Sequence, residues 1–187
     1  MTTIVIFNKD GGQAMIEIRP VIDSDFEAIA AIYAYYVTNT RVTAEFEVPT
    51  AAIMKTRADL YQANGLPYLV AIDQGQIVGF GYLAPYSDRL GYRYAVTLSI
   101  YLDPNKRGKG LGKSLLAALE TKALSMPIRH ILSLVSSDNT VSLDFHQGQG
   151  FSEIGRFPQA MQKLGAWVDL VWLLKSYEEN KELWDHD

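Results

Sequence analysis

The chain has 187 residues, of which 48% are hydrophobic and 20% charged, a composition typical of a globular protein with a sizeable core and not of a disordered or fibrous chain. A formal net charge of −4 argues against a nucleic-acid-binding surface. The absence of cysteine excludes disulfides, thiolate metal sites and a cysteine nucleophile, and we expect a cytoplasmic protein.

Metal and membrane partners are also unexpected. The three histidines, His130, His146 and His186, do not pair at metal-ligand spacing, so we expect no metal cofactor. No apolar run approaches the roughly 18 residues that a membrane-spanning helix needs. We therefore expect neither a membrane nor a nucleic acid as a partner.

Composition divides the chain into one domain with a short segment at each end. Residues 1–14 carry a brief apolar stretch that ends at Asn8-Lys9-Asp10-Gly11-Gly12, and we expect an N-terminal extension there. Residues 15–175 contain no repeat, linker or low-complexity segment, so they predict one domain. Residues 176–187 are mostly charged and predict a solvated tail that carries Trp184.

The first half of the domain predicts a strand, two helices and a hairpin. Apolar and polar residues alternate over 16–19, as in a half-buried strand. Ser24-Asp25-Phe26-Glu27 has the pattern of a capping box, and apolar residues recur after it at helical spacing. A second helix is expected over about 50–63. Two strands that flank a glycine-containing turn then form a hairpin, over 68–72 and 77–83.

The second half alternates strands and helices. A long β-rich run, a helix, a nearly continuous apolar strand and a capped helix precede two last strands, over 92–102, 111–124, 130–135, 139–148, 151–157 and 167–174. The order β-α-α-β-β-β-α-β-α-β-β predicts an α/β (α+β) fold, with a mixed central sheet of about seven strands flanked by about four helices.

One segment between the long β-rich run and the following helix combines glycines with basic residues. Glycines allow a tight turn and leave no Cβ atoms to hold a ligand away. The helix start adds unpaired amides and a positive dipole end, which together favour an anion. The segment predicts a pyrophosphate cradle, made by Arg107, Gly108, Lys109, Gly110, Leu111, Gly112, Lys113 and Ser114. A glycine-rich surface turn with incidental lysines is the competing interpretation.

The cradle is neither a Walker loop nor the usual dinucleotide fingerprint, because its glycine spacing differs from both. Arg107-x-x-Gly110-x-Gly112 is similar to the Arg/Gln-x-x-Gly-x-Gly/Ala signature of GNAT N-acetyltransferases, and the element order resembles that fold from about Ile16 to Leu174. Six further stretches resemble the phosphinothricin and methionine-sulfone acetyltransferases within that superfamily: Gly91-Tyr92-Arg93, Val96 with Ser99-Ile100-Tyr101-Leu102, Asp138-Asn139-x-x-Ser142, His146 with Gly150-Phe151, Gly155-Arg156-x-Pro158-Gln159, and Lys163-x-Gly165-x-Trp167-x-Asp169-Leu170.

The resemblance implies direct transfer of an acetyl group from acetyl-CoA to the primary amine of a small amino-acid-like substrate, without an acyl-enzyme. It also implies a homodimer with strands near the C-terminus at the interface. Pantetheine contacts would come from Ile100, Tyr101 and Leu102, and the side chain of Asn139 would bond the cofactor arm. An ordinary helix cap is the alternative role of Asn139.

His146 occupies the position where many GNAT enzymes have a tyrosine that protonates the departing thiolate. A histidine can donate a proton near neutral pH. The alternative is a helix-face histidine bonded to the backbone.

The resemblance fails at the general base. The related enzymes typically have Val-Glu on the strand before the cofactor, whereas this chain reads Val96-Thr97-Leu98-Ser99. Thr97 is neutral and cannot act as a carboxylate base. Either Glu45 or Glu47, in the loop after the first helix, serves instead, or a water held by Thr97 relays the proton, or the family activity is absent. Solvated loop charge is the alternative for both glutamates.

The substrate side of the site is expected around Leu98, Ser99 and two arginines. Arg89 and Arg93 suit a substrate carboxylate or phosphinate, because a guanidinium group can form two parallel hydrogen bonds with such a group. Two other functions stay open: a GNAT enzyme acting on a peptide, lysine or polyamine amine, and a non-catalytic acyl-CoA-binding module.

Overall fold

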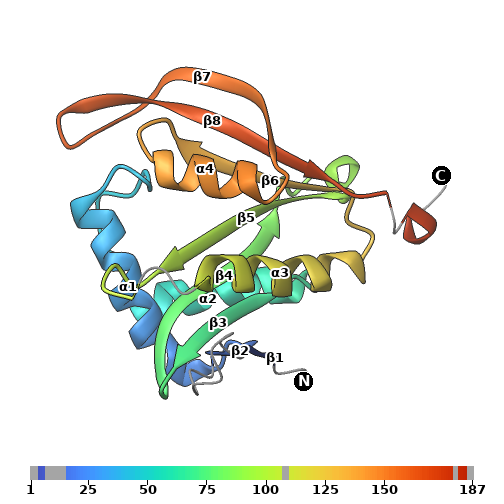
Figure 1. Ribbon diagram of the computed structural model, residues 1–187, viewed down its shortest axis with the longest axis horizontal. Helices are drawn as coiled ribbons and strands as arrows, with labels where there is room; N and C mark the ends of the chain where they lie inside the picture. The colour runs from blue at the N-terminus through green and yellow to red at the C-terminus, as the bar shows by residue number, and fades with distance from the viewer. Residues whose placement is uncertain (1–3, 7–15, 107–109, 179–180, 185–187) are drawn as a thin grey trace. The chain divides into compact units, whose positions relative to one another are not determined.

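The computed structural model describes residues 4–6, 16–106, 110–178 and 181–184 (Figure 1). Their contacts group the chain into two compact units made of separated segments. The first unit holds residues 1–34, 49–83 and 99–123, and the second holds residues 35–48, 84–98 and 124–187. Helix α1 (Phe26–Asn39) and strands β4 (Gln76–Pro85) and β5 (Ala95–Leu102) contribute residues to both units.

The first unit is built on antiparallel strands. Strands β1 (Ile4–Ile6), β2 (Ile16–Pro20), β3 (Tyr68–Asp73) and β4 follow one another in that order, and each pairs antiparallel with the next. The turn between β3 and β4 is the predicted one, with positive φ angles at Gln74 (51°) and Gly75 (77°). Strand β1 lies in the predicted N-terminal extension.

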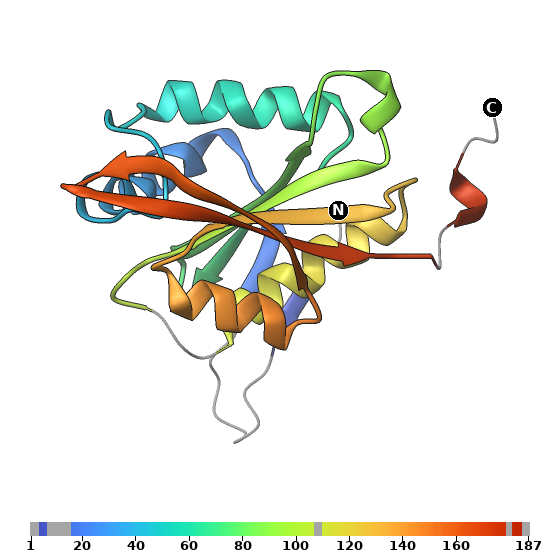
Figure 2. The ribbon, with the colours of Figure 1, turned by 90° about the horizontal axis from the view of Figure 1, so that it is seen from above.

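Helices α2 (Ala51–Ala63) and α3 (Leu111–Leu124) lie on opposite faces of these strands (Figure 2). Tyr61 of α2 stacks on Tyr82 of β4 at a centroid distance of 5.2 Å. Gly81, the residue before Tyr82, faces Leu119 of α3 instead. Neighbouring residues of a strand point to opposite faces, so Tyr82 contacts α2 while Gly81 lies against α3.

The start of α1 differs from the predicted capping box. A short 3-10 turn over Asp23–Asp25 precedes the helix. The buried carboxylate of Asp25 accepts the backbone N–H of Ile22 at 2.8 Å and both terminal nitrogens of Arg19, at 2.7 and 2.9 Å. Asp25 therefore takes the role that the predicted capping box gave to Glu27, with Ile22 as the residue whose N–H is bonded.

The second unit contains the first half of β5, β6 (His130–Ser136), β8 (Ala166–Ser176) and β7 (Ser152–Lys163), in that spatial order. Strand β6 runs parallel to β5 and antiparallel to β8, and β7 pairs antiparallel with β8. Helix α4 (Thr140–Gly148) joins β6 to β7. Within the described residues the chain thus has eight strands and four α-helices, a mixed arrangement as expected.

The hairpin of β7 and β8 is longer than predicted. The register between the strands shifts between Phe157 and Met161, and Gln159, directly after Pro158, has a φ of 48°. Proline in a strand normally indicates its end, which explains the short prediction. Here a bulge accommodates the proline and the strand continues beyond it. Leu164-Gly165, both with positive φ, closes the hairpin.

The C-terminal segment after β8 includes a 3-10 turn over Lys181–Leu183. Trp184 follows it, with its ring centroid 6.3 Å from that of Tyr94 and the guanidinium carbon of Arg129 4.8 Å from its ring. The tail therefore includes one packed aromatic contact. None of the helices within the described ranges has both the length and the apolar character needed to cross a membrane.

Candidate active site

The N-terminal end of α3 forms the described part of the predicted cradle. Gly110 has a φ of 73°, and its carbonyl accepts the first helical hydrogen bond from Ser114 N–H at 3.0 Å. The side chains of Leu111 and Leu115 are buried, so the core anchors this end and Leu111 can offer a ligand only its backbone. Lys113 is exposed. The predicted cradle residues Arg107, Gly108 and Lys109 lie outside the described residues.

The chain turns tightly where it leaves β5. The backbone N–H of Asp103 donates to the Val78 carbonyl at 2.9 Å, which ties the end of β5 to β4. The Asp103 carboxylate then accepts the N–H of Asn105 at 2.9 Å, and its carbonyl accepts that of Lys106 at 3.0 Å. The turn holds the described chain up to Lys106, and the described residues resume at Gly110, next to the start of α3.

Two glycines of β4 allow the end of β5 to lie close. A Cβ atom at Gly79 would come within 2.6 Å of Leu102 Cδ2 and 3.0 Å of the Tyr101 carbonyl oxygen. At Gly81 it would come within 3.1 Å of Ile100 Cγ1. The side chains of Ile100 and Leu102 therefore lean on β4. The sequence analysis did not assign these glycines a role, although a Gly-x-Gly pair inside a strand pattern indicates close approach of another segment.

Tyr101 points to the other face of β5. Its ring packs edge-on against Tyr33 at 4.9 Å and stacks on Phe80 at 5.2 Å, inside the aromatic cluster of the first unit. Successive side chains of a strand point to opposite faces, so the Tyr101 side chain points away from the face that Ile100 and Leu102 share. Tyr101 can thus contribute its backbone to a cofactor, while its side chain belongs to the core.

Thr97 lies on the first half of β5. Its hydroxyl donates to the Ala84 carbonyl of β4 at 3.4 Å, and the residue is half-buried. Its neighbours Val96 and Leu98 are buried on the opposite face, so Leu98 can meet a substrate only through its backbone. Ser99 is half-buried and lies in the first unit.

The two candidate bases lie in the loop between α1 and α2. Glu45 is half-buried, and its N–H donates to the hydroxyl of Thr43 at 3.4 Å. Glu47 is exposed. Among the described residues, neither carboxylate is hydrogen-bonded to Thr97. A carboxylate base and a water held by Thr97 therefore remain two separate predictions for the general base.

Asn139 is the N-cap of α4. Its side-chain oxygen accepts the N–H of Ser142 at 3.3 Å, as a helix cap does. The side-chain NH₂ of Asn139 has no hydrogen-bond partner among the described residues. The two predicted roles are therefore compatible, because the oxygen caps the helix and the nitrogen is available to a ligand.

His146 is buried on α4 between two phenylalanine rings, with centroid distances of 5.1 Å to both Phe145 and Phe151. Its Nδ1 atom lies 2.7 Å from the Ser142 carbonyl, one helical turn earlier. A carbonyl only accepts, so Nδ1 carries the proton and donates. Burial lowers the pKa of His146, and the bond to Ser142 opposes this only in part. In the neutral form of the ring, Nε2 therefore carries no proton.

The two arginines lie in the connection from β4 to β5. Arg89 is exposed and precedes a 3-10 turn over Leu90–Tyr92, and its N–H donates to the hydroxyl of Ser87 at 3.2 Å. The guanidinium carbon of Arg93 lies 4.4 Å from the centre of the Tyr94 ring. Arg93 is half-buried and donates to the Leu90 carbonyl at 3.4 Å, and both arginines lie in the second unit.

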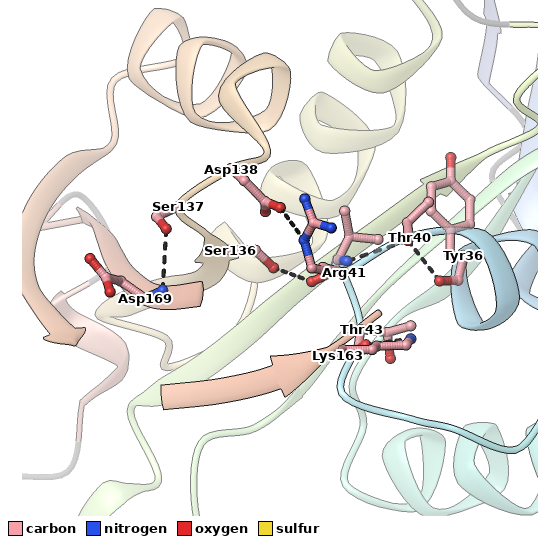
Figure 3. A network of polar contacts seen from close by, with 10 residues as sticks. Tyr36, Thr40, Arg41, Thr43, Ser136, Ser137, Asp138, Lys163 and Asp169 are labelled. Carbon is pink, nitrogen blue, oxygen red and sulfur yellow. Dashed lines mark hydrogen bonds and ion pairs between the residues drawn. The ribbon is translucent and has the colours of Figure 1, made fainter. Parts of the chain in front are cut away.

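A polar network in the second unit holds the loop after α1 (Figure 3). Ser136 donates its hydroxyl hydrogen bond to the Arg41 carbonyl, and Arg41 Nε donates to Asp138 at 2.6 Å. The buried ammonium group of Lys163 donates to the Thr43 carbonyl at 2.8 Å. Sequence reasoning assigned Lys163 no role, since nothing in the pattern brings residues 43 and 163 together.

Among the described residues, no group of three or more His, Cys, Asp or Glu side chains is arranged to hold a metal ion. The titratable groups discussed above are instead distributed over β5, α4 and the loop after α1.

Residues 18–172 match the family model described as the acetyltransferase (GNAT) domain. The chain belongs to the GNAT acetyltransferase family. The family, the fold class and the enzyme class that the sequence predicted are thus confirmed.

Known GNAT proteins cover nearly the whole of this chain. It is 36% identical over 155 residues to a phosphinothricin N-acetyltransferase of Alcaligenes faecalis, covering 82% of this chain and 79% of the relative. It is 32% identical to an L-methionine sulfoximine/L-methionine sulfone acetyltransferase of Pseudomonas paraeruginosa, over 83% and 91% of the two chains. A solved phosphinothricin acetyltransferase of Sinorhizobium meliloti in complex with acetyl-CoA superposes with a TM-score of 0.85, at 31% identity and 89% and 91% coverage.

Proposed function

We propose that this GNAT enzyme transfers the acetyl group of acetyl-CoA directly to the primary amine of a small amino-acid-like substrate that carries an acidic group. Phosphinothricin, methionine sulfoximine and methionine sulfone are the substrates named for its relatives. The observation that carries the proposal is the core-anchored start of α3, where Gly110 has a φ of 73° and its carbonyl accepts the N–H of Ser114.

The cofactor half of the site uses mostly backbone groups. The first-turn amides of α3 suit the pyrophosphate, and the segment from Arg107 to Ser114 is the one that we propose to hold it. The backbone of Ile100, Tyr101 and Leu102 suits the pantetheine amides, as an added strand would. The side-chain nitrogen of Asn139 suits the cofactor arm. When bound, acetyl-CoA supplies the activated acetyl group. The protein's part is to hold that group and remove the proton of the amine.

Proton removal has two candidate routes. In one, a carboxylate, Glu45 or Glu47, accepts the proton directly. In the other, a water bonded to the Thr97 hydroxyl relays it, since this oxygen donates to Ala84 and keeps its lone pairs for a second partner. With Nδ1 bonded to the Ser142 carbonyl, Nε2 of His146 can protonate the departing thiolate only when the ring is in its imidazolium form.

For the acidic group of the substrate, we propose Arg89 and Arg93. Arg89 is exposed and its backbone is held by the turn that follows it. A carboxylate or phosphinate would form two parallel bonds with such a guanidinium group.

We also propose a cytoplasmic homodimer that associates through β7 and β8. Residues 152–159 of β7 are all exposed, on both faces of the strand. Large apolar side chains stand among them and on β8, with 52% exposure at Ile154, 59% at Phe157 and 63% at Trp167. Apolar surface of this kind indicates a partner. Light scattering after size-exclusion chromatography should give the mass of a dimer, and Trp167→Lys should give that of a monomer.

Two measurements test the proposed activity. Acetyl-CoA should raise the melting temperature, because a ligand of the native state stabilises it by mass action. Thiol release should then be followed with phosphinothricin, methionine sulfone, a peptide N-terminus and a polyamine, with N-acetylated methionine sulfone as the amine-blocked control. Turnover of the peptide N-terminus or the polyamine, without turnover of phosphinothricin or methionine sulfone, would show that the proposed substrate class is wrong. Stabilisation without turnover would leave an acyl-CoA-binding module.

A further inference from the structure

Lys163, the last residue of β7, is a buried cation. Its exposure is 2%, and its Nζ atom donates to the Thr43 carbonyl at 2.8 Å (Figure 3). Removing an ammonium group from water is unfavourable unless its charge is compensated. Burial accordingly lowers the pKa of Lys163, and the negative charge of Glu45 opposes that shift. An apolar side chain would fill this position at a lower cost, so the cation must serve the loop that it contacts.

Three residues that interact with the ammonium group come from one short segment, 41–48, which we name the 41–48 loop. Thr43 is 8% exposed, and its hydroxyl accepts the N–H of Glu45. The ring centre of Phe46 lies 6.0 Å from Lys163 Nζ. The carbonyl of Thr43, the charge of Glu45 and the ring of Phe46 thus all face one cation. Lys163 is the group that these three residues share.

The same loop has a second anchor. Ser136 donates to the carbonyl of Arg41, and the Arg41 side chain forms an ion pair with Asp138. The N–H of Asn139 donates to the Ser136 carbonyl at 2.9 Å, so this anchor belongs to the turn that begins α4. The start of the 41–48 loop is therefore tied to the turn that presents Asn139, and Lys163 fixes the position two residues further along.

Beyond the two anchors, the loop presents side chains to solvent. Phe46 is 70% and Val48 43% exposed, and Glu47 is exposed as well. An exposed apolar pair that alternates with two glutamates suits a small ligand with an ammonium group and an alkyl chain, which is the chemistry of the proposed acceptor. Such a surface recognises a ligand only if its backbone is held in place.

We propose that Lys163 is a positioning residue for the acceptor amine: by bonding Thr43 it fixes the 41–48 loop, which binds the amine substrate through Glu45 and Phe46. This inference rests on the proposed function, because it concerns the amine side of that reaction. Lys163 itself does not touch the substrate.

The test compares Lys163→Met, which keeps the length of the side chain without its charge, with Lys163→Arg, which restores a donor. Lys175→Met is the matched control, since Lys175 is a partly buried lysine of β8 beside the rings of Phe151 and Tyr177. Lys163→Met should raise the KM for the amine about tenfold, as expected for the loss of one charged hydrogen bond. The KM for acetyl-CoA should stay within about twofold, and Lys163→Arg should recover most of the loss.

Hydrogen exchange provides the second readout and does not depend on turnover. Peptides that cover the 41–48 loop should exchange faster in Lys163→Met, while peptides of α3 keep their protection. If Lys163→Met does not fold, Lys163→Gln, which retains an N–H donor but no charge, takes its place. Unchanged exchange in the loop, or equal rises in the KM for the amine and the KM for acetyl-CoA, would overturn the positioning role. Failure of the unaltered protein to acetylate any amine would instead reject the proposed function.

Discussion

The Nδ1 atom of His146 lies 2.7 Å from the carbonyl oxygen of Ser142. That bond commits the proton of the neutral ring to the helix backbone, and the ring is buried between two phenylalanines. Proton donation from Nε2 would require the imidazolium form, which burial disfavours. Its geometry makes His146 first of all a packed part of α4.

His146 should make the folded state sensitive to acid. Its folded pKa lies below the unfolded value of about 6.5, so the unfolded chain binds the proton more readily. The contribution of the neutral ring is fully present above about pH 6.5 and is lost as the pH falls through the folded pKa. Urea unfolding at pH 8 and pH 5 should show a smaller loss of stability in His146→Gln than in the unaltered protein. Equal losses would contradict the buried neutral state.

The two roles of Asn139 can be separated by two substitutions. Asn139→Ala removes the cap of α4 and should cost about 1 kcal/mol of stability. Asn139→Ser keeps a capping oxygen, so the free energy of unfolding should change by only a few tenths of a kcal/mol. Both variants lose the side-chain nitrogen. Calorimetric titration should therefore show weaker acetyl-CoA binding in both, whereas a pure cap would leave the affinity of Asn139→Ser unchanged.

Gly79 should not tolerate a side chain. A Cβ atom there would meet the Tyr101 carbonyl oxygen at 3.0 Å and the Leu102 side chain at 2.6 Å. Gly79→Ala should destabilise the protein by about 1–3 kcal/mol through overpacking. Gly148→Ala is the control, because a Cβ atom at Gly148 has no neighbour within 4 Å. Chemical denaturation of the two variants measures the contrast, and similar stabilities would contradict the close approach of β4 and β5.

Thr97 should matter through its hydroxyl if a water relays the proton. Thr97→Val should then lower kcat/KM about tenfold or more, with unchanged stabilisation by acetyl-CoA, and Thr97→Ser should retain the activity. If Glu45 or Glu47 accepts the proton directly, the opposite result is expected. Glu45→Gln or Glu47→Gln would remove or shift the ascending limb of the pH profile of kcat/KM, and Thr97→Val would have little effect.

The order of the elements and the helix start after β5 could be predicted because they depend on local signals, namely alternation, glycines and helical spacing. The face that the Tyr101 side chain occupies could not be read from the motif, because the packing of Tyr33 and Phe80 against it comes from distant parts of the chain. The end of β7 was placed too early, since Pro158 reads as a terminator until the bulge is known. The contact of Lys163 with Thr43 joins residues 120 positions apart, and no local pattern contains such information.

The bulge of β7 also limits how this protein meets its neighbours. Strand β7 is the last strand of its sheet, where free N–H groups could recruit further chains edge to edge. Pro158 has no N–H, and the N–H of Gln159 is already bonded to the Asp169 carboxylate at 2.9 Å. Pro158 and Gln159 therefore have no free N–H at two consecutive positions of this strand. We expect this to disfavour the addition of a strand from another chain across them.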